Sequence, residues 1–163
     1  MTTSDLLAQL GFSHYCIVTN VDSVTDEQAL QEPAPSGNPM NYVLGHILSV
    51  RNRVFEKLGS RVYWSDEIRK LYNTSWKRAD KSKLLSLTEL TKCETETHAQ
   101  LKSAIENFAG PWDEKFAEPS VGGTETLGEF VQFFLLHETY HAGQLGSLRR
   151  TLALRGKIGQ VED

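Results

Sequence analysis

Apolar positions along residues 127–152 recur every three or four residues, which is the spacing of one face of an α-helix. At about 100° per residue they form a stripe roughly 80° wide. The stripe consists of Leu127, Phe130, Phe134, His137, His141, Leu145, Leu148 and Leu152. Thr126 and Glu129 have the spacing of a capping box, so we expect the helix to begin there. Because His137 and His141 belong to the stripe, the pattern predicts that both imidazoles point into the core.

The same periodicity predicts three earlier helices. Their expected bounds are about residues 4–20, 39–58 and 82–109. Asn38 has the side chain of an N-cap, and Pro39 suits the first helical position, where a missing N–H costs nothing. Gly59 is expected to end the second helix, and Gly110 with Pro111 is expected to end the third.

Two long connections separate these helices. Residues 60–81 hold two of the three tryptophans and leave room for one short helical turn, while residues 110–124 contain several glycines and prolines. A connection as long as the first permits a crossover, after which the second and third helices run parallel. Since no stretch has the pattern of a β-strand, we predict an all-α four-helix bundle in a single domain over residues 1–163.

Composition and charge narrow the function classes. The chain has 163 residues, and 39% of them are hydrophobic. A chain of this size and composition can form a stable core without disulfide bonds or structural metal ions. The net charge is -4, and acidic and basic residues are mixed along the chain, so the sequence predicts no basic patch that would bind nucleic acid or anionic lipid. Neither partner is expected. The first residues lack a signal-peptide pattern, and no apolar run could cross a membrane. Cys16 and Cys93 form no CxxC motif and are expected to be reduced thiols in a cytoplasmic protein.

His137 and His141 are the first candidates for chemistry. Imidazoles at positions i and i+4 lie on one helical face, close enough to bind one metal ion. Burying two such rings in an apolar stripe is costly unless their nitrogens are satisfied, and a metal satisfies one nitrogen of each. Hydrogen bonds from core histidines to carbonyls or tyrosines would do the same, so the spacing alone leaves both interpretations open.

The remaining histidines each allow more than one interpretation. His46 lies at the edge of the second helix's apolar stripe, which suits either a third metal ligand in a cleft or a half-exposed surface residue. His14, on the apolar face of the first helix, is a candidate fourth ligand, catalytic proton carrier or hydrogen-bonded core residue. His98, at the rim of the third helix's stripe, is interpreted as structural or solvent-facing.

Other catalytic motifs do not fit. Ser147 lies within a predicted helix, whereas a nucleophile elbow needs a strand, a turn and a helix. Gly122 and Gly123 have no preceding strand and no following Lys-Ser/Thr, so they do not form a phosphate-binding loop. Glu138 follows His137, but the HExxxH spacing is one residue longer than in zinc proteases. It is also predicted to point away from the apolar stripe.

Two segments resemble the DinB-like superfamily, which includes YfiT-like proteins and bacterial low-molecular-weight-thiol transferases. They are NPMNYVLGHILSVRNRV around His46 and HETYHAGQLGSLRRTLAL around His137 and His141, and the second is the more specific. With the order of the helices, the resemblance covers essentially the whole chain. It implies an up-down-down-up four-helix bundle with a long crossover between helices 2 and 3. It also implies a divalent metal held by His46, His137 and His141.

That ligand set has chemical consequences. Three imidazoles leave coordination positions open, as in catalytic sites, and a metal so held lowers the pKa of bound water or a bound thiol. Zinc, nickel, iron and manganese all accept imidazole. Gln144, one turn beyond His141, is a candidate catalytic residue that would orient a ligand or metal-bound water, with a packed glutamine as the alternative. Asn41 and Tyr140 are weaker candidates.

Arg149 and Arg150 end the last predicted helix. Arg149 is a candidate for binding the carboxylate of a thiol cofactor, and the alternative is that both charges complement the helix macrodipole.

The resemblance implies a metal-dependent transferase that adds a low-molecular-weight thiol to electrophilic small molecules, in detoxification or the stress response. One alternative is a metal-dependent hydrolase that uses metal-bound hydroxide. Another is a non-catalytic metal-binding or stress interaction module, in which His14 or a carboxylate would complete the ligand shell. A homodimer is expected, because exposed apolar faces of such bundles often pair.

Overall fold

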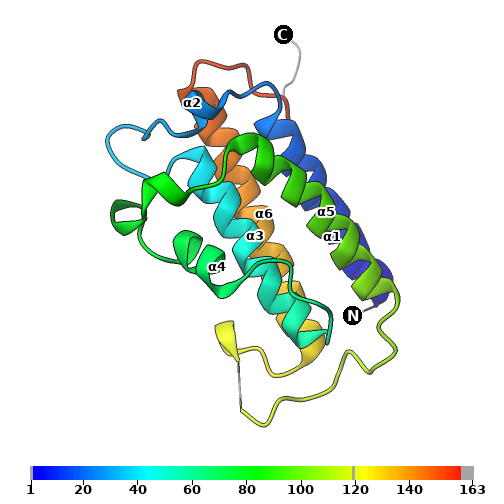
Figure 1. Cartoon of the computed structure of the whole chain (residues 1–163). Helices are drawn as coiled ribbons and strands as arrows, with labels where there is room; N and C mark the ends of the chain where they lie inside the picture. Colours follow the sequence, from blue (N-terminus) through cyan, green and yellow to red (C-terminus); the bar gives the residue numbers. More distant parts are fainter. Residues whose placement is uncertain (1, 119, 159–163) are drawn as a thin grey trace.

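Four long helices carry the fold in a computed structural model that describes residues 2–118 and 120–158 (Figure 1). They are α1 (Thr3–Val21), α3 (Met40–Lys57), α5 (Leu87–Glu106) and α6 (Leu127–Thr151). The connections contain the short helices α2 (Asp26–Ala29) and α4 (Asp66–Asn73) and the 3-10 turns η1 (Trp76–Arg78), η2 (Lys81–Lys83) and η3 (Val121–Gly123). Among the described residues the only β pairing is one isolated bridge between Lys115 and Thr126. The predicted all-α fold is confirmed.

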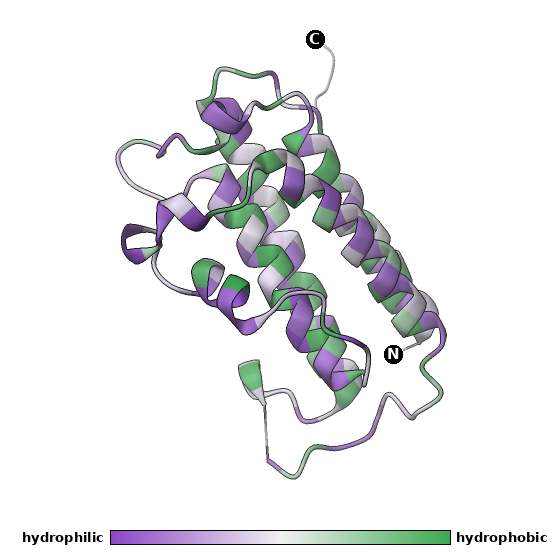
Figure 2. Ribbon diagram, viewed as in Figure 1, coloured by the Kyte–Doolittle hydropathy of each residue, from purple (hydrophilic) through white to green (hydrophobic). Residues whose placement is uncertain are grey.

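The long helices pack as a ring in which α1 and α3 each contact both α5 and α6. One apolar cluster joins the beginnings of α1 and α6 to the ends of α3 and α5, and a second cluster joins their opposite ends. Helices α1 and α6 therefore run in one direction, and α3 and α5 run in the other (Figure 1). Apolar residues alternate with polar ones along each of them, as the colours of Figure 2 show.

Local hydrogen bonds define where the helices begin. The predicted capping box of α6 is confirmed, since Thr126 accepts from the backbone of Glu129 and the Glu129 carboxylate accepts in return. Helix α5 has the same device at Ser86 and Glu89, so the expected start near Ser82 is wrong. Residues 81–83 instead form η2, whose N-cap is Asp80.

Helix α3 begins and ends by different means. Pro39 is its N-cap and no side chain caps the first turn, so the expectation that Asn38 fills this position is wrong. At the other end, Gly59 adopts a positive φ of +66°. The Gly59 N–H donates to Glu56 at 3.2 Å and the Ser60 N–H donates to Phe55 at 2.8 Å. This pair of bonds is a Schellman motif, which confirms the predicted end of the helix.

The crossover between α3 and α5 is more ordered than the single turn expected from the sequence. It contains α4 and two 3-10 turns, and both of its tryptophans are buried. Trp64 stacks on Tyr72, with ring centroids 5.6 Å apart, and Trp76 packs edge-on against Tyr42 at 5.8 Å. Tyr42 of α3 also contacts Tyr72 of α4, with ring centroids 6.0 Å apart, so these aromatic side chains link α4 to α3, with which it packs.

A buried ion network crosses the middle of the bundle. Arg51 of α3 is only 2% exposed, and its Nε and Nη2 donate to the two carboxylate oxygens of Glu138 on α6, both at 2.8 Å. Nη2 also donates to Glu94 of α5 at 2.9 Å, while Nη1 donates to the Glu94 carbonyl at 3.0 Å and the Thr97 hydroxyl at 2.8 Å. The guanidinium thus uses all its nitrogens to join three helices.

Helix α1 completes the network. The Ser13 hydroxyl donates to Glu138 at 2.6 Å, and Nδ1 of His14 lies 3.0 Å from the Glu94 carboxylate. Burial raises the pKa of Glu94, but its hydrogen bond to His14 and the charge of Arg51 outweigh this and lower it. The carboxylate therefore stays ionised, and all four long helices contribute side chains to one buried hydrogen-bond network.

Removing the cation tests the importance of this network. Arg51→Met should lower the free energy of unfolding by about 3–5 kcal/mol, because two carboxylates would stay buried without their counter-ion. Lys102→Met, which breaks an exposed pair with Glu106 on α5, should cost at most about 1 kcal/mol. Urea denaturation of both variants in the presence of a chelator measures the difference, and equal losses would contradict it.

Candidate metal centre

Three histidines from two helices, α3 and α6, lie close together. One ring nitrogen each of His46, His137 and His141 lies within 4.8 Å of the others. The ring centroids of His137 and His141 are 4.4 Å apart, and that of His46 lies 5.4 Å and 4.9 Å from them. The structure therefore brings together the three residues that the DinB-like resemblance implied.

The prediction that His137 and His141 point into the core is met only in part, because both side chains are half-buried. Glu138 is instead the residue that points into the interior, with 4% of its surface exposed. The sequence pattern had placed it off the apolar stripe. The reason is that α6 packs against α1 as well as α3, so its buried face is broader than the stripe. The histidines lie at the edge of that face, where a small molecule can approach.

His46 is held in one tautomer by the crossover. Its Nδ1 lies 2.9 Å from the backbone carbonyl of Tyr72, at the end of α4. A carbonyl only accepts hydrogen bonds, so Nδ1 carries the proton and Nε2 carries the lone pair. Such a bond to the far nitrogen is typical of metal-binding histidines.

His141 is oriented in the same way by a side chain. Its Nδ1 donates to Oε1 of Gln144 at 2.7 Å, and Gln144 Nε2 donates to the Tyr140 hydroxyl at 3.1 Å. The lone pair of His141 Nε2 is consequently directed at Nε2 of His137, 3.1 Å away. Gln144, predicted as a catalytic residue, is thus placed at the cluster as a partner of a candidate ligand.

The three side chains fit a divalent metal. Two nitrogens about 2.0–2.1 Å from one ion lie roughly 3 Å or a little more apart, as the two Nε2 atoms do. Burial, followed by the charges of His141 and His46, lowers the pKa of His137 to about 4, and burial also lowers that of His141. Both rings are therefore neutral at pH 7, the form that binds metal.

Gly45 and Tyr72 position His46 but were not predicted from the sequence. A Cβ on Gly45 would lie 2.1 Å from Cδ1 of Tyr72, so only glycine allows the tyrosine ring to pack on α3 beside His46. Tyr72 is fully buried, and its hydroxyl accepts from the Leu85 N–H at 2.9 Å. A glycine inside a predicted helix, next to a candidate ligand, was the available signal.

Two other predicted site residues lie elsewhere. His14 is on the α1–α5 side, where it contacts Glu94 and stacks on His98 with centroids 3.8 Å apart. Burial and the charge of His14 lower the pKa of His98 to about 4. Arg149 is 3% exposed, and its guanidinium donates to the carbonyls of Asn20, Asp22 and Arg155. The structure brings neither His14 nor Arg149 to the three histidines.

Comparison with known proteins identifies relatives of the fold. The model of the DinB superfamily matches residues 18–145, which include all three histidines. A crystal structure of a conserved protein from Enterococcus faecalis is similar, with a TM-score of 0.75 and 16% sequence identity over 94% of this chain and 98% of that one. No curated protein matches the chain. No helix in the described part of the chain is long and apolar enough to cross a membrane.

Gly45→Ala tests whether the Tyr72 carbonyl supports the cluster. The added methyl group should displace Tyr72 and weaken Co²⁺ or Zn²⁺ binding about 10- to 100-fold, the usual effect of losing such a partner. Gly143→Ala is the matched control, since no atom lies within 4 Å of a Cβ there, two residues from His141. It should leave metal affinity unchanged. Equal affinities of both variants in chelator competition would contradict the role of Tyr72.

Proposed function

The chain belongs to the DinB superfamily, and on that premise we propose that it is a divalent-metal-dependent enzyme that transfers a low-molecular-weight thiol to an electrophilic small molecule. The observation that carries this proposal is the convergence of His46, His137 and His141, two of them with the far nitrogen already hydrogen-bonded. Zinc, nickel, iron and manganese are all compatible with imidazole ligands.

The chain's residues have separate tasks in the proposed reaction. His46, His137 and His141 would hold the ion, and the Tyr72 carbonyl and Gln144 keep their rings oriented. When bound, a divalent ion with open positions lowers the pKa of a thiol. The thiol loses its proton to solvent water, its sulfur bonds to the electrophilic carbon, and a leaving group departs with the electron pair of the broken carbon bond. We assign no step to His14 or Arg149.

The half-buried position of the histidines favours an enzyme over a closed structural site. An ion held by only three side chains, all of them half-buried, keeps coordination positions that a substrate can reach. A hydrolase would need the same opening, with water in place of the thiol. A non-catalytic module would need a fourth ligand, and no further His, Cys, Asp or Glu of the described residues belongs to the cluster.

We also propose that the protein is a cytoplasmic homodimer. Cys16 and Cys93 are free thiols, as is usual in reducing compartments. Phe12 and Leu136, on the adjacent helices α1 and α6, are each more than half exposed, as are Tyr15 and Tyr140 beside them. A second copy of the chain would cover this apolar surface.

Glutamate substitutions test the dimer. Phe12→Glu and Leu136→Glu should convert a dimer to a monomer in analytical ultracentrifugation, because each buries a charge in the proposed interface. Val62→Glu, at an exposed apolar position of the crossover, should have no effect. A wild-type monomer at every concentration would contradict the proposal.

Metal removal and reloading test the activity. Protein stripped of metal and reloaded separately with Zn²⁺, Ni²⁺, Fe²⁺ or Mn²⁺ should consume cysteine or glutathione in the presence of monobromobimane. His137→Ala should fall to the uncatalysed rate with the same circular dichroism spectrum. His98→Ala, which removes a histidine outside the cluster, should remain active.

The outcomes separate the candidate functions. Thiol consumption that depends on metal and on His137 supports the transferase. Hydrolysis of ester or amide substrates by the loaded protein, without thiol consumption, would replace it with the hydrolase. Full activity of His137→Ala would overturn both enzyme proposals.

A further inference from the structure

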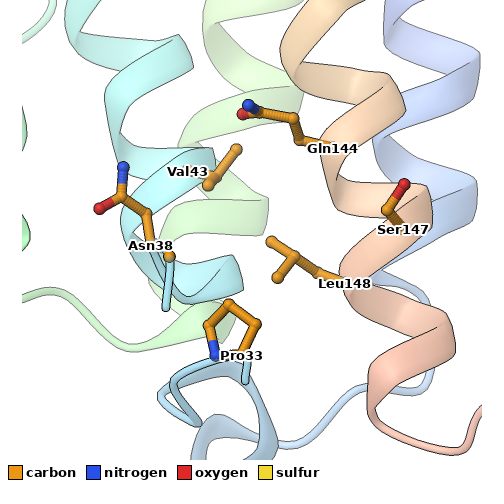
Figure 3. Close-up of a pocket in the computed structure, with 7 residues that line it drawn as sticks. Pro33, Asn38, Val43, Gln144, Ser147 and Leu148 are labelled. Atoms are coloured by element: carbon orange, nitrogen blue, oxygen red, sulfur yellow. The ribbon is translucent and has the colours of Figure 1, made fainter. Parts of the chain in front are cut away.

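A cavity of about 340 Å³ lies beside the histidine cluster, between the start of α3 and the second half of α6 (Figure 3). Its volume is at the lower end of the range for small-molecule sites. Gln144 and Leu148 reach into it from α6, Val43 borders it on α3, and Pro33 forms its floor in the loop before α3. The cavity is therefore built from three separate parts of the chain.

The cavity adjoins the candidate metal ligands on both helices. Val43 precedes His46 by three residues, and Gln144 follows His141 by three, so the cavity begins about one helical turn, or 5 Å, from the cluster. Gln144 belongs to both, since its Oε1 accepts from His141 while its side chain lines the cavity. Its Nε2 bonds to Tyr140 with one hydrogen and retains a second.

The lining of this cavity is uncharged. Pro33, Val43 and Leu148 supply apolar surface, and Asn38, Gln144 and Ser147 supply neutral polar groups. None of the described lining residues carries an ionisable side chain. A ligand with a carboxylate or an ammonium group would lose hydration here without gaining a counter-ion, whereas an amide or a carbonyl group finds hydrogen-bonding partners.

The loop wall is shaped before any ligand binds. A Cβ on Gly37 would lie 2.8 Å from Cγ of Pro33, so the glycine allows the loop to fold tightly over its own proline. Next to Pro33 in the chain, the Glu32 carboxylate accepts the indole N–H of Trp76 at 2.7 Å. The Glu32 carboxylate therefore has a hydrogen-bond donor in the crossover between α3 and α5.

We propose that this cavity binds the electrophilic acceptor and selects uncharged molecules with a small apolar body. The apolar body packs against Pro33, Val43 and Leu148, and a carbonyl or amide oxygen accepts from Gln144. This assignment of an acceptor rests on the proposed transferase function. The ionised groups of a low-molecular-weight thiol would then lie outside the cavity.

Three isosteric probes test the selection by charge. Benzamide, benzoate and benzamidinium have the same shape but are neutral, anionic and cationic. In metal-free protein, where benzoate has no ion to bind, benzamide should bind at least about tenfold more tightly than either charged probe. Addition of benzamide should shift the methyl resonances of Val43 and Leu148 in the NMR spectrum. Equal or tighter binding of benzoate or benzamidinium would overturn the proposal.

Substitutions on α6 locate the bound probe. Ser147→Phe should fill the edge of the cavity and weaken benzamide binding about tenfold, with metal content unchanged. Thr151→Phe, an exposed position one turn further on and outside the lining, should leave both unchanged. Undiminished benzamide binding by Ser147→Phe would overturn the proposal.

Binding is measured here without metal or turnover, so the two proposals fail separately. A protein that binds metal and transfers thiols but does not discriminate between the probes lacks the proposed acceptor cavity. A protein that binds no metal but discriminates between the probes at Val43 and Leu148 retains a site for uncharged ligands and loses the transferase function.

Discussion

The buried charge of Arg51 constrains the rest of the bundle. A guanidinium in the interior is tolerated only while its carboxylate partners surround it, so α3, α5 and α6 must present Arg51, Glu94 and Glu138 at one level. That requirement fixes the rotation of α6, because Glu138 has to face inward. His137, the preceding residue, is thereby turned to the edge of the buried face, and His141 follows one turn later. On α3, Arg51 follows His46 by five residues. The inward position of Arg51 therefore keeps the His46 imidazole opposite those of His137 and His141.

The groups that orient the histidine rings are of two kinds, a backbone carbonyl and a side-chain amide. His46 depends on a backbone carbonyl of the crossover, whose position depends in turn on a glycine that admits the Tyr72 ring. His141 depends on Gln144 of its own helix, which also lines the adjoining cavity. The long connection between α3 and α5 is thus part of the candidate site. In addition, the shared glutamine links the orientation of a candidate metal ligand to the binding of an uncharged molecule in the cavity.

Periodicity predicted the all-α fold and the shared face of His137 and His141, because both depend on local spacing along one helix. It could not predict which side of that helix is innermost, since this depends on how many neighbours the helix packs against. Glu138 was predicted to point away from the apolar stripe for the same reason, and nothing was predicted for Arg51, because a buried ion pair is recognisable only when both partners are known. The Tyr72 carbonyl has no side-chain signature at all. The choice of His46 as third ligand came from the family resemblance, and its distance to the other two came from the structure.

The proposed function depends on the binding of one metal ion by His46, His137 and His141. Inductively coupled plasma mass spectrometry would measure the bound metal in protein purified without a histidine tag and reconstituted with a mixture of Zn²⁺, Ni²⁺, Fe²⁺ and Mn²⁺. We expect close to one ion per chain in the wild-type protein and loss of that ion in both His46→Ala and His137→Ala. A wild-type protein that retains no metal, or a His46→Ala variant that retains a full equivalent, would contradict it.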